Sequence, residues 1–365
     1  MAEDSPRSPL SAQSRPAPGR AAGGNETGRF EAHTSEPVHD GWDMVEDLPP
    51  VRTEVRDESP RRVITRNDSP DLPFDRSINP YRGCEHGCIY CYARPTHAWL
   101  GMSAGLDFES RLIARPGAAE ALEREIGARG YVPRAIALGS NTDPYQPVER
   151  DRGITRAILE VLSAWNHPLT IVTKGALIER DLDLVASMAA RGLAHAAISI
   201  TTLDPVLCRA MEPRAPSPER RLRAVRILSD AGVPVRVSAS PMIPALTDHE
   251  LEAILAAAAG AGARVASAIA LRLPREVAPL FRDWLDAHVP GRAARVMGRV
   301  RELHGGRDYD PEWHARMTGQ GVWADLLEKR FRIACRRLGL SSRSVPLRTD
   351  LFARPPRPGD QLTLI

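Results

Sequence analysis

Short apolar segments alternate with longer amphipathic segments through the middle of this 365-residue chain. The apolar segments are expected to form strands, at residues 135–138, 169–173, 196–201, 233–238 and 265–271. The amphipathic segments are expected to form helices, at residues 118–128, 152–165, 182–191, 218–231 and 248–261. Strands and helices that alternate at this spacing predict an α/β fold, with parallel strands covered by helices. A full or partial barrel and an open doubly wound sheet both fit this pattern.

The segments on either side of this region have a different composition. Residues 1–70 are rich in Pro, Ser, Gly, Arg and Glu and lack apolar periodicity, which predicts a disordered N-terminal tail. Residues 71–290 are expected to form the α/β domain, and residues 291–340 a helical C-terminal extension, clearest at 321–338. The Pro- and Arg-rich residues 341–365 are expected to form a flexible tail.

Charge and hydropathy restrict where the protein acts. The formal net charge of +3 is too small by itself to indicate a nucleic-acid or membrane partner. The N-terminus lacks the basic-then-apolar pattern of a signal peptide. The most apolar run, at 253–263, is shorter than the roughly 20 residues that span a bilayer. We therefore expect a cytoplasmic protein without a membrane partner.

Three of the five cysteines, Cys84, Cys88 and Cys91, lie within eight residues in the spacing C-x3-C-x2-C. Thiolates this close together are typical of a site for a soft metal. A zinc site needs four ligands, so His86, His97 or a distant cysteine would have to complete it. An iron–sulfur cluster normally takes four cysteines, and three would leave one iron open to a substrate. The spacing favours the open iron–sulfur site.

The run NPYRGCEHGCIYCYAR from Asn79 to Arg94 resembles the radical S-adenosylmethionine (SAM) enzymes. It is most similar to the branch that contains spore photoproduct lyase, a DNA-repair enzyme, and the resemblance covers about residues 74–273. It implies a partial (β/α)6 barrel of the radical SAM type, with the cysteines on the loop after the first strand. It also implies a [4Fe-4S] cluster, SAM and an electron donor. Reductive cleavage of SAM would then give a 5′-deoxyadenosyl radical that abstracts a substrate hydrogen.

Polar residues at the ends of the expected strands are candidates for binding SAM, because barrel active sites lie at the carboxyl ends of strands. The resemblance matches Thr142 and Asp143 with positions that hold the methionyl amine. It matches Lys174 with a lysine that contacts the SAM carboxylate, and Ser199 with a ribose contact. The alternatives are an Asp-Pro turn at Asp143 and an ordinary serine in a strand.

Tyr90 and Tyr92 flank the third cysteine and match tyrosines that relay a hydrogen atom in spore photoproduct lyase. A cysteine completes that relay, and Ser140 replaces it here. A hydroxyl holds its hydrogen more tightly than a thiol, so this departure argues against spore photoproduct repair itself. Cys208 is a substitute donor or, more simply, a small buried cysteine. Glu212 is expected to contact substrate or to pair with an arginine.

The C-terminal part favours a DNA or RNA substrate and repair-like chemistry. Residues 299–357 carry thirteen Lys/Arg against seven Asp/Glu, and 323–337 predict a basic amphipathic helix. The pentapeptide from Gln361 to Ile365 resembles the motif by which bacterial DNA-maintenance proteins bind the replication sliding clamp. Two alternatives are a radical SAM enzyme acting on a protein or small molecule, and a non-catalytic metal-binding adaptor.

Overall fold

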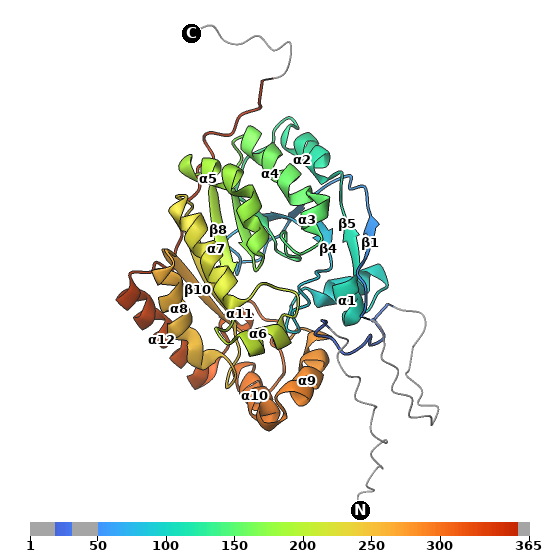
Figure 1. Cartoon of the computed structure of the whole chain (residues 1–365), viewed down its shortest axis with the longest axis vertical. Coiled ribbons are helices and arrows are strands. Elements are labelled where there is room, and N and C mark those ends of the chain that lie inside the picture. The colour runs from blue at the N-terminus through green and yellow to red at the C-terminus, as the bar shows by residue number, and fades with distance from the viewer. Residues whose placement is uncertain (1–18, 31–49, 357–365) are drawn as a thin grey trace, which may run out of the picture.

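A computed structural model describes residues 19–30 and 50–356, and its centre is a seven-stranded sheet with the order β10-β9-β8-β7-β6-β3-β2 (Figure 1). A smaller sheet has the order β1-β5-β4. The strands are β1 (Glu54–Asp57), β2 (Ile64–Arg66), β3 (Arg76–Ile78), β4 (Tyr81–Arg82), β5 (Arg111–Ala114), β6 (Ile136–Leu138), β7 (Leu169–Thr173), β8 (Ala194–Ser199), β9 (Val235–Met242) and β10 (Val265–Ala270).

Helices follow most strands and pack side by side in an arc outside the large sheet (Figure 1). They are α1 (Leu106–Ser110), α2 (Ala118–Ile126), α3 (Glu149–Arg152), α4 (Ile154–Ala164), α5 (Leu182–Ala190), α6 (Pro205–Met211), α7 (Pro218–Asp230), α8 (Leu251–Gly260), α9 (Val277–His288), α10 (Pro290–Leu303), α11 (Ala315–Thr318) and α12 (Gly321–Leu338). Three 3-10 helices are η1 (Arg94–Leu100), η2 (Ala176–Asp181) and η3 (Asp248–Glu250).

Six strands of the large sheet, β3 and β6 to β10, run parallel, while β2 pairs antiparallel with β3. Six parallel strands with helices on the outside agree with the partial (β/α)6 architecture expected from the sequence. Among the described residues, β10 and β2 are the two edges of the sheet and do not pair with each other. The carboxyl ends of all six parallel strands therefore lie at one rim of an open barrel.

The five expected strands and five expected helices are all present, with boundaries that differ by a few residues. The first strand of the barrel, β3, was not located from the sequence because it has only three residues and begins with an arginine. Ser217 is the N-cap of α7, and its side chain accepts a hydrogen bond from the backbone N–H of Arg220. Local capping chemistry therefore defines the start of this helix.

The prediction of a disordered tail over residues 1–70 was wrong for its described part. Strand β1 pairs with β5, and β2 extends the large sheet. Upstream, Arg20 is 4% exposed and donates hydrogen bonds to the carbonyls of Glu109 and Val51. The β1 strand is mostly exposed, so it lacks the apolar pattern that announces a strand. Residues 1–18 and 31–49 lie outside the described part of the chain.

The prediction of a flexible C-terminal tail was also wrong, for residues 341–353. The Ser341 carbonyl accepts a hydrogen bond from Ala266 in β10, and the Arg348 N–H donates to the carbonyl of Gly192, before β8. Phe352 then packs on Trp165, ahead of β7. This segment therefore crosses the amino ends of several strands, on the side opposite the rim. The proposed clamp-binding peptide from Gln361 to Ile365 lies outside the described residues.

The helical extension predicted at 291–340 consists of α10, α11 and α12, and α12 packs beside α8 (Figure 1). Arg330 of α12 pairs with Glu252 of α8 at 2.5 Å, and the Trp323 indole donates to Asp248. Segment 314–317 touches both edges of the sheet: Arg316 pairs with Asp71 between β2 and β3, and Met317 accepts from Arg272 beyond β10. Within the described chain, no helix has the length and apolar character required to cross a bilayer.

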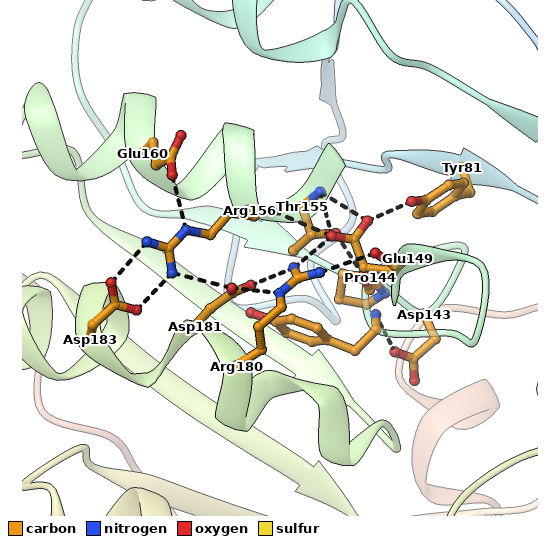
Figure 2. A network of polar contacts seen from close by, with 11 residues as sticks. Tyr81, Asp143, Pro144, Glu149, Thr155, Arg156, Glu160, Arg180, Asp181 and Asp183 are labelled. Carbon is orange, nitrogen blue, oxygen red and sulfur yellow. Dashed lines mark hydrogen bonds and ion pairs between the residues drawn. The ribbon is translucent and has the colours of Figure 1, made fainter. Parts of the chain in front are cut away.

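Glu149 is the centre of a buried polar network that holds the segment between β6 and α4 (Figure 2). Its carboxylate is fully buried and accepts hydrogen bonds from the Tyr81 hydroxyl at 2.5 Å and from the backbone N–H of Thr155. Arg180 donates to the same carboxylate at 2.7 Å. The Thr155 hydroxyl in turn donates to the carbonyl of Pro144. The hydrogen bonds of Glu149 and Thr155 thus hold the segment between β6 and α4 in place.

We expect Glu149→Gln to lower the free energy of unfolding by about 2–4 kcal/mol, because it removes the charge that satisfies several buried donors. Urea unfolding at neutral pH measures this change. The matched control is Glu160→Gln, in which an exposed partner of Arg156 is lost, and we expect a change below about 0.5 kcal/mol. Equal effects of the two substitutions would contradict the central role of Glu149.

Candidate active site

A pocket opens at the carboxyl ends of the parallel strands and encloses about 1020 Å3 of space without protein atoms, including its mouth. All nine site residues predicted from the sequence line it: Cys84, Cys88, Tyr90, Cys91, Tyr92, Thr142, Asp143, Lys174 and Ser199. Residues more than a hundred positions apart in the sequence thus meet at one rim of the barrel.

The three cysteines lie on the loop that connects β4 to η1. Cys84 and Cys88 are buried and Cys91 is partly buried, and all three are free thiols. Burial raises the pKa of the Cys84 and Cys88 thiols above their usual range. Gly87 has φ +66°, and a Cβ at this position would lie 2.6 Å from a carboxylate oxygen of Glu109. The loop therefore requires glycine between the first two cysteines.

The buried guanidinium of Arg94 fixes the backbone of the cysteine loop. It donates to the carbonyl of Cys88 at 2.9 Å and to that of Gly87 at 3.0 Å, and it pairs with Glu109 at 2.5 Å. The Glu109 carboxylate also accepts hydrogen bonds from the backbone N–H groups of Ala21 and Ala22. The N-terminal segment around Ala21 and Ala22 therefore supports the cysteine loop through its hydrogen bonds to Glu109.

Thr142 and Asp143 follow β6 and use most of their polar atoms within the chain. The Thr142 hydroxyl donates to the carbonyl of Gly83 at 2.6 Å and accepts from the Gln146 amide at 2.9 Å. Asp143 accepts from the Thr173 hydroxyl at 2.5 Å and from the backbone N–H of Lys174 at 2.7 Å. These contacts join the loop after β6 to the cysteine loop and to the end of β7.

His86 lies beside the same carboxylate, with its Nδ1 atom 3.2 Å from Oδ2 of Asp143. Burial alone would raise the pKa of Asp143, but His86, the Thr173 hydroxyl and the Lys174 N–H together lower it to about 2. Asp143 is therefore an anion, and His86, the Thr173 hydroxyl and the Lys174 N–H stabilise its charge.

Lys174 and Ser199 present polar groups that the described chain leaves open to the pocket. The Lys174 ammonium lies 5.6 Å from the centre of the Tyr90 ring, and among the described residues it makes no hydrogen bond or ion pair. The Ser199 hydroxyl, at the end of β8, likewise has no hydrogen-bond partner there. An ammonium and a hydroxyl placed in this way suit an anionic and a hydroxyl-bearing ligand group.

Glu212 and Arg221 form a fully buried ion pair beneath these two residues. Glu212 follows α6 and also accepts a hydrogen bond from the Tyr90 hydroxyl. Arg221, on α7, donates to the carbonyl of Ser199 at 3.1 Å. The expectation that Glu212 contacts substrate or pairs with an arginine is resolved in favour of the pair. The pair links the cysteine loop to the strand end that carries Ser199.

The two tyrosines beside Cys91 differ in their surroundings. Tyr90 is 5% exposed, and its hydroxyl points to Glu212 and Thr201 rather than to the mouth of the pocket. Tyr92 is 47% exposed, and its hydroxyl donates to the carbonyl of Ser140. Tyr92 is therefore the more exposed of the two tyrosines that line the pocket.

Cys208 is buried and does not line the pocket. Its thiol lies 3.6 Å from a Glu212 carboxylate oxygen, and burial followed by the Glu212 charge raises its pKa to about 12. The simpler expectation, a small buried cysteine, agrees with this position. Ser140 does line the pocket, and the Asn79 amide donates to its hydroxyl at 3.0 Å.

Two arginines of the site were not identified from the sequence. Arg272 follows β10 and lines the pocket, so the rule that polar residues gather at strand ends would have found it. Arg221 shares a helix face with the buried residues Ala224, Val225 and Leu228. An arginine on the apolar stripe of a helix is the signal that could have identified the buried pair.

The donor set fits an iron–sulfur cluster, because three thiols line one pocket beside an open ammonium group. In residues 19–30 and 50–356, no three Cys, His, Asp or Glu side chains gather closely enough to hold a single metal ion. Each cysteine of a cluster binds a different iron atom, so its thiols need not converge on one point.

Glu212→Gln should destabilise the protein, because it leaves the Arg221 guanidinium buried without its counter-charge. Burial alone would raise the pKa of Glu212, but Arg221 and Lys174 lower it to about 2, from an ordinary 4.5. The stability from this ionisation is present above about pH 4.5 and is lost as the pH falls towards 2. Urea unfolding should therefore show a gap between wild type and variant that narrows on acidification over that range. A gap that is independent of pH would contradict the assignment.

The model of the radical SAM superfamily matches residues 78–258. An uncharacterized protein of Mycobacterium tuberculosis is 36% identical over 265 residues, covering 72% of this chain and 76% of that protein. An uncharacterized protein of Methanocaldococcus jannaschii is 30% identical over 173 residues, covering 47% of this chain and 62% of that protein.

A solved structure of a spore photoproduct lyase mutant has a TM-score of 0.57 and 17% sequence identity, covering 79% of this chain and 81% of that chain. At this level of identity the likeness concerns the fold. The family match extends from β3 into α8 and includes the cysteine loop and the strand ends around the pocket. This chain belongs to the radical SAM superfamily, whose enzymes use a [4Fe-4S] cluster and SAM.

Proposed function

We propose that this radical SAM enzyme acts on nucleic acid, and that the pocket at the carboxyl rim of the barrel is its active site. The observation that carries the proposal is that three thiols, an unpaired ammonium and an exposed tyrosine line the same pocket. The cofactors, when bound, supply reductive cleavage of SAM and the removal of a hydrogen atom from the substrate. The chain binds and orients the reacting groups and keeps water away from them.

Cys84, Cys88 and Cys91 are assigned as the three cluster ligands. The Arg94–Glu109 pair holds the backbone of their loop, so the thiols are positioned before any metal binds. Lys174 is assigned to the SAM carboxylate, because its ammonium lines the pocket and forms no direct ion pair in the described chain. Burial alone would lower the pKa of this ammonium, although the Glu212 charge lies near enough to raise it. Ser199 is assigned to the ribose, because its hydroxyl also lacks a partner there.

Thr142 and Asp143 are assigned to the side of the pocket that receives the methionyl amine. The negative charge of Asp143, with its pKa near 2, attracts an ammonium group. Its contacts with Thr173 and the Lys174 N–H leave it a fixed anion rather than a proton donor. Asp143 therefore contributes by charge and by its position beside the cysteine loop.

Tyr92 is assigned to the substrate side, because it is the exposed tyrosine at the pocket. Tyr90 is assigned a supporting role, since its hydroxyl is bound to Glu212 and its ring faces Lys174. The position of the relay cysteine of spore photoproduct lyase is occupied by Ser140, whose hydroxyl is hydrogen-bonded to Asn79. The proposed reaction therefore excludes a thiol donor at that position and is not spore photoproduct repair itself.

The cluster assignment predicts that iron binding and SAM cleavage depend on three of the five cysteines and not on the others. After anaerobic reconstitution, Cys84→Ala, Cys88→Ala and Cys91→Ala should each lose bound iron and should fail to cleave SAM to 5′-deoxyadenosine. Cys335→Ala is the matched control, since it removes a buried cysteine of α12 that lies outside the pocket. Wild-type iron content and SAM cleavage in any of the three variants would overturn the assignment of that ligand.

The nucleic-acid proposal predicts that wild-type protein binds oligonucleotides with an affinity that falls steeply as salt increases, because phosphate contacts release counterions. Deuterium placed in the nucleotides of the substrate should then appear in 5′-deoxyadenosine. If wild-type protein cleaves SAM but neither binds oligonucleotides nor acquires deuterium, a protein or small-molecule substrate replaces nucleic acid. If it neither binds iron nor cleaves SAM, the enzymatic proposal fails.

A further inference from the structure

The mouth of the pocket carries a cation for which the cofactor assignments give no role. Arg272 follows β10, lines the pocket and is half-buried. Its guanidinium carbon lies 4.8 Å from the centre of the Tyr92 ring, and one of its nitrogens lies 3.1 Å from the Met317 sulfur. Among the residues that the structure describes, Arg272 forms no ion pair.

The charged side chains that line the pocket consequently include more cations than anions. These charged side chains are Asp143, Lys174 and Arg272, and the His86 ring lies beside Asp143. Asp143 is occupied by His86 and by donors of the chain, and Lys174 is assigned to the SAM carboxylate. Arg272 is left as a positive charge at the mouth, where it is available to bind an anionic group of the substrate.

The surroundings of Arg272 specify what kind of anion fits. The guanidinium lies over one face of the planar Tyr92 ring, and nearly half of the Tyr92 surface remains exposed for a further contact. A flat face next to a fork of N–H donors matches a nucleotide, with its base on the ring and its phosphate on the guanidinium. An acidic peptide would supply the charge but not the stacking partner.

Short polar groups next to Tyr92 hold its hydroxyl in place. The Asn79 side chain accepts a hydrogen bond from the backbone N–H of Asn141 at its Oδ1 atom (2.8 Å) and donates one from its Nδ2 atom to the Ser140 hydroxyl. Ser140 in turn accepts from the Tyr92 hydroxyl through its carbonyl. This chain of contacts fixes the orientation of the Tyr92 ring, so the surface for a base is already in place.

We propose that Arg272 and Tyr92 form a subsite for an unstacked nucleotide, in which Arg272 binds the phosphodiester and the Tyr92 ring stacks on the base. This subsite rests on the proposed function and adds the form of the substrate to it. A base reached by a pocket within a barrel has to leave its stack, so the site takes single strands or extruded nucleotides in preference to an intact duplex.

The test is binding of a fluorescein-labelled single-stranded oligonucleotide to reconstituted protein in the presence of SAM and without reductant, so that no turnover occurs. Arg272→Gln should weaken binding about tenfold, and the slope of log K against log salt should fall by about one phosphate contact. Arg272→Lys should restore the slope but only part of the affinity, because lysine keeps the charge without the planar fork. Tyr92→Phe keeps the ring but loses the hydrogen bond to Ser140, so it should bind slightly more weakly than wild type, and Tyr92→Leu should bind much more weakly.

Arg226→Gln is the matched control, because Arg226 is exposed on α7 and does not line the pocket. The affinity for SAM, measured by equilibrium dialysis, should be the same in Arg272→Gln as in wild type. An acidic peptide of equal charge should not compete with the oligonucleotide, and intact duplex should bind more weakly than single strand.

The outcomes separate the subsite from the proposed function. Oligonucleotide binding by wild type with an unchanged salt slope in Arg272→Gln would overturn the subsite and leave the nucleic-acid function standing. Equal binding of duplex, or competition by the acidic peptide, would also overturn the subsite. Failure of the wild-type protein to bind any oligonucleotide would overturn the nucleic-acid function itself.

Discussion

The buried ion pair between Glu212 and Arg221 connects the parts of the site that come from distant segments of the chain. Glu212 accepts the Tyr90 hydroxyl, so the cysteine loop is anchored on its carboxylate. Arg221 donates to the carbonyl of Ser199, so the end of β8 is anchored on its guanidinium. A buried pair of this kind does not guarantee stability, but removing either charge leaves the other unpaired in a medium of low polarity. The arrangement of cysteine loop and strand end depends on both charges being present.

Around this pair, the fold brings residues from distant parts of the sequence together at one end of the large sheet. Six parallel strands bring their carboxyl ends to one rim, and polar residues at or just after the ends of β6 to β10 line the pocket. The cysteine loop follows the short strands β3 and β4, and Arg94 and Glu109 fix its backbone. Hydrogen bonds of Thr142 and Gln146 connect the loop after β6 to the cysteine loop. The Glu149 network holds the same loop through the contact of Thr155 with Pro144.

Much of this arrangement was predictable from the sequence because the signals are local. The five strands and helices show clear periodicity, and three cysteines within eight residues leave few interpretations. The segments that were missed lack such signals. Strand β1 is mostly exposed and β3 has three residues, while the segment 341–353 attaches to the barrel by scattered backbone contacts and by Phe352. Arg272 follows a strand end and Arg221 lies on the buried face of α7, so both carry a sequence signal, but only the structure shows that they belong to the site.

The central claim is that Cys84, Cys88 and Cys91 hold a cluster with one iron open to SAM. Electron paramagnetic resonance of the reconstituted and reduced protein, recorded before and after SAM is added, tests this claim most directly. The account predicts the signal of a one-electron-reduced [4Fe-4S] cluster and a clear change in that signal when SAM binds. A protein that shows no cluster signal, or a signal that SAM leaves unchanged, would contradict it.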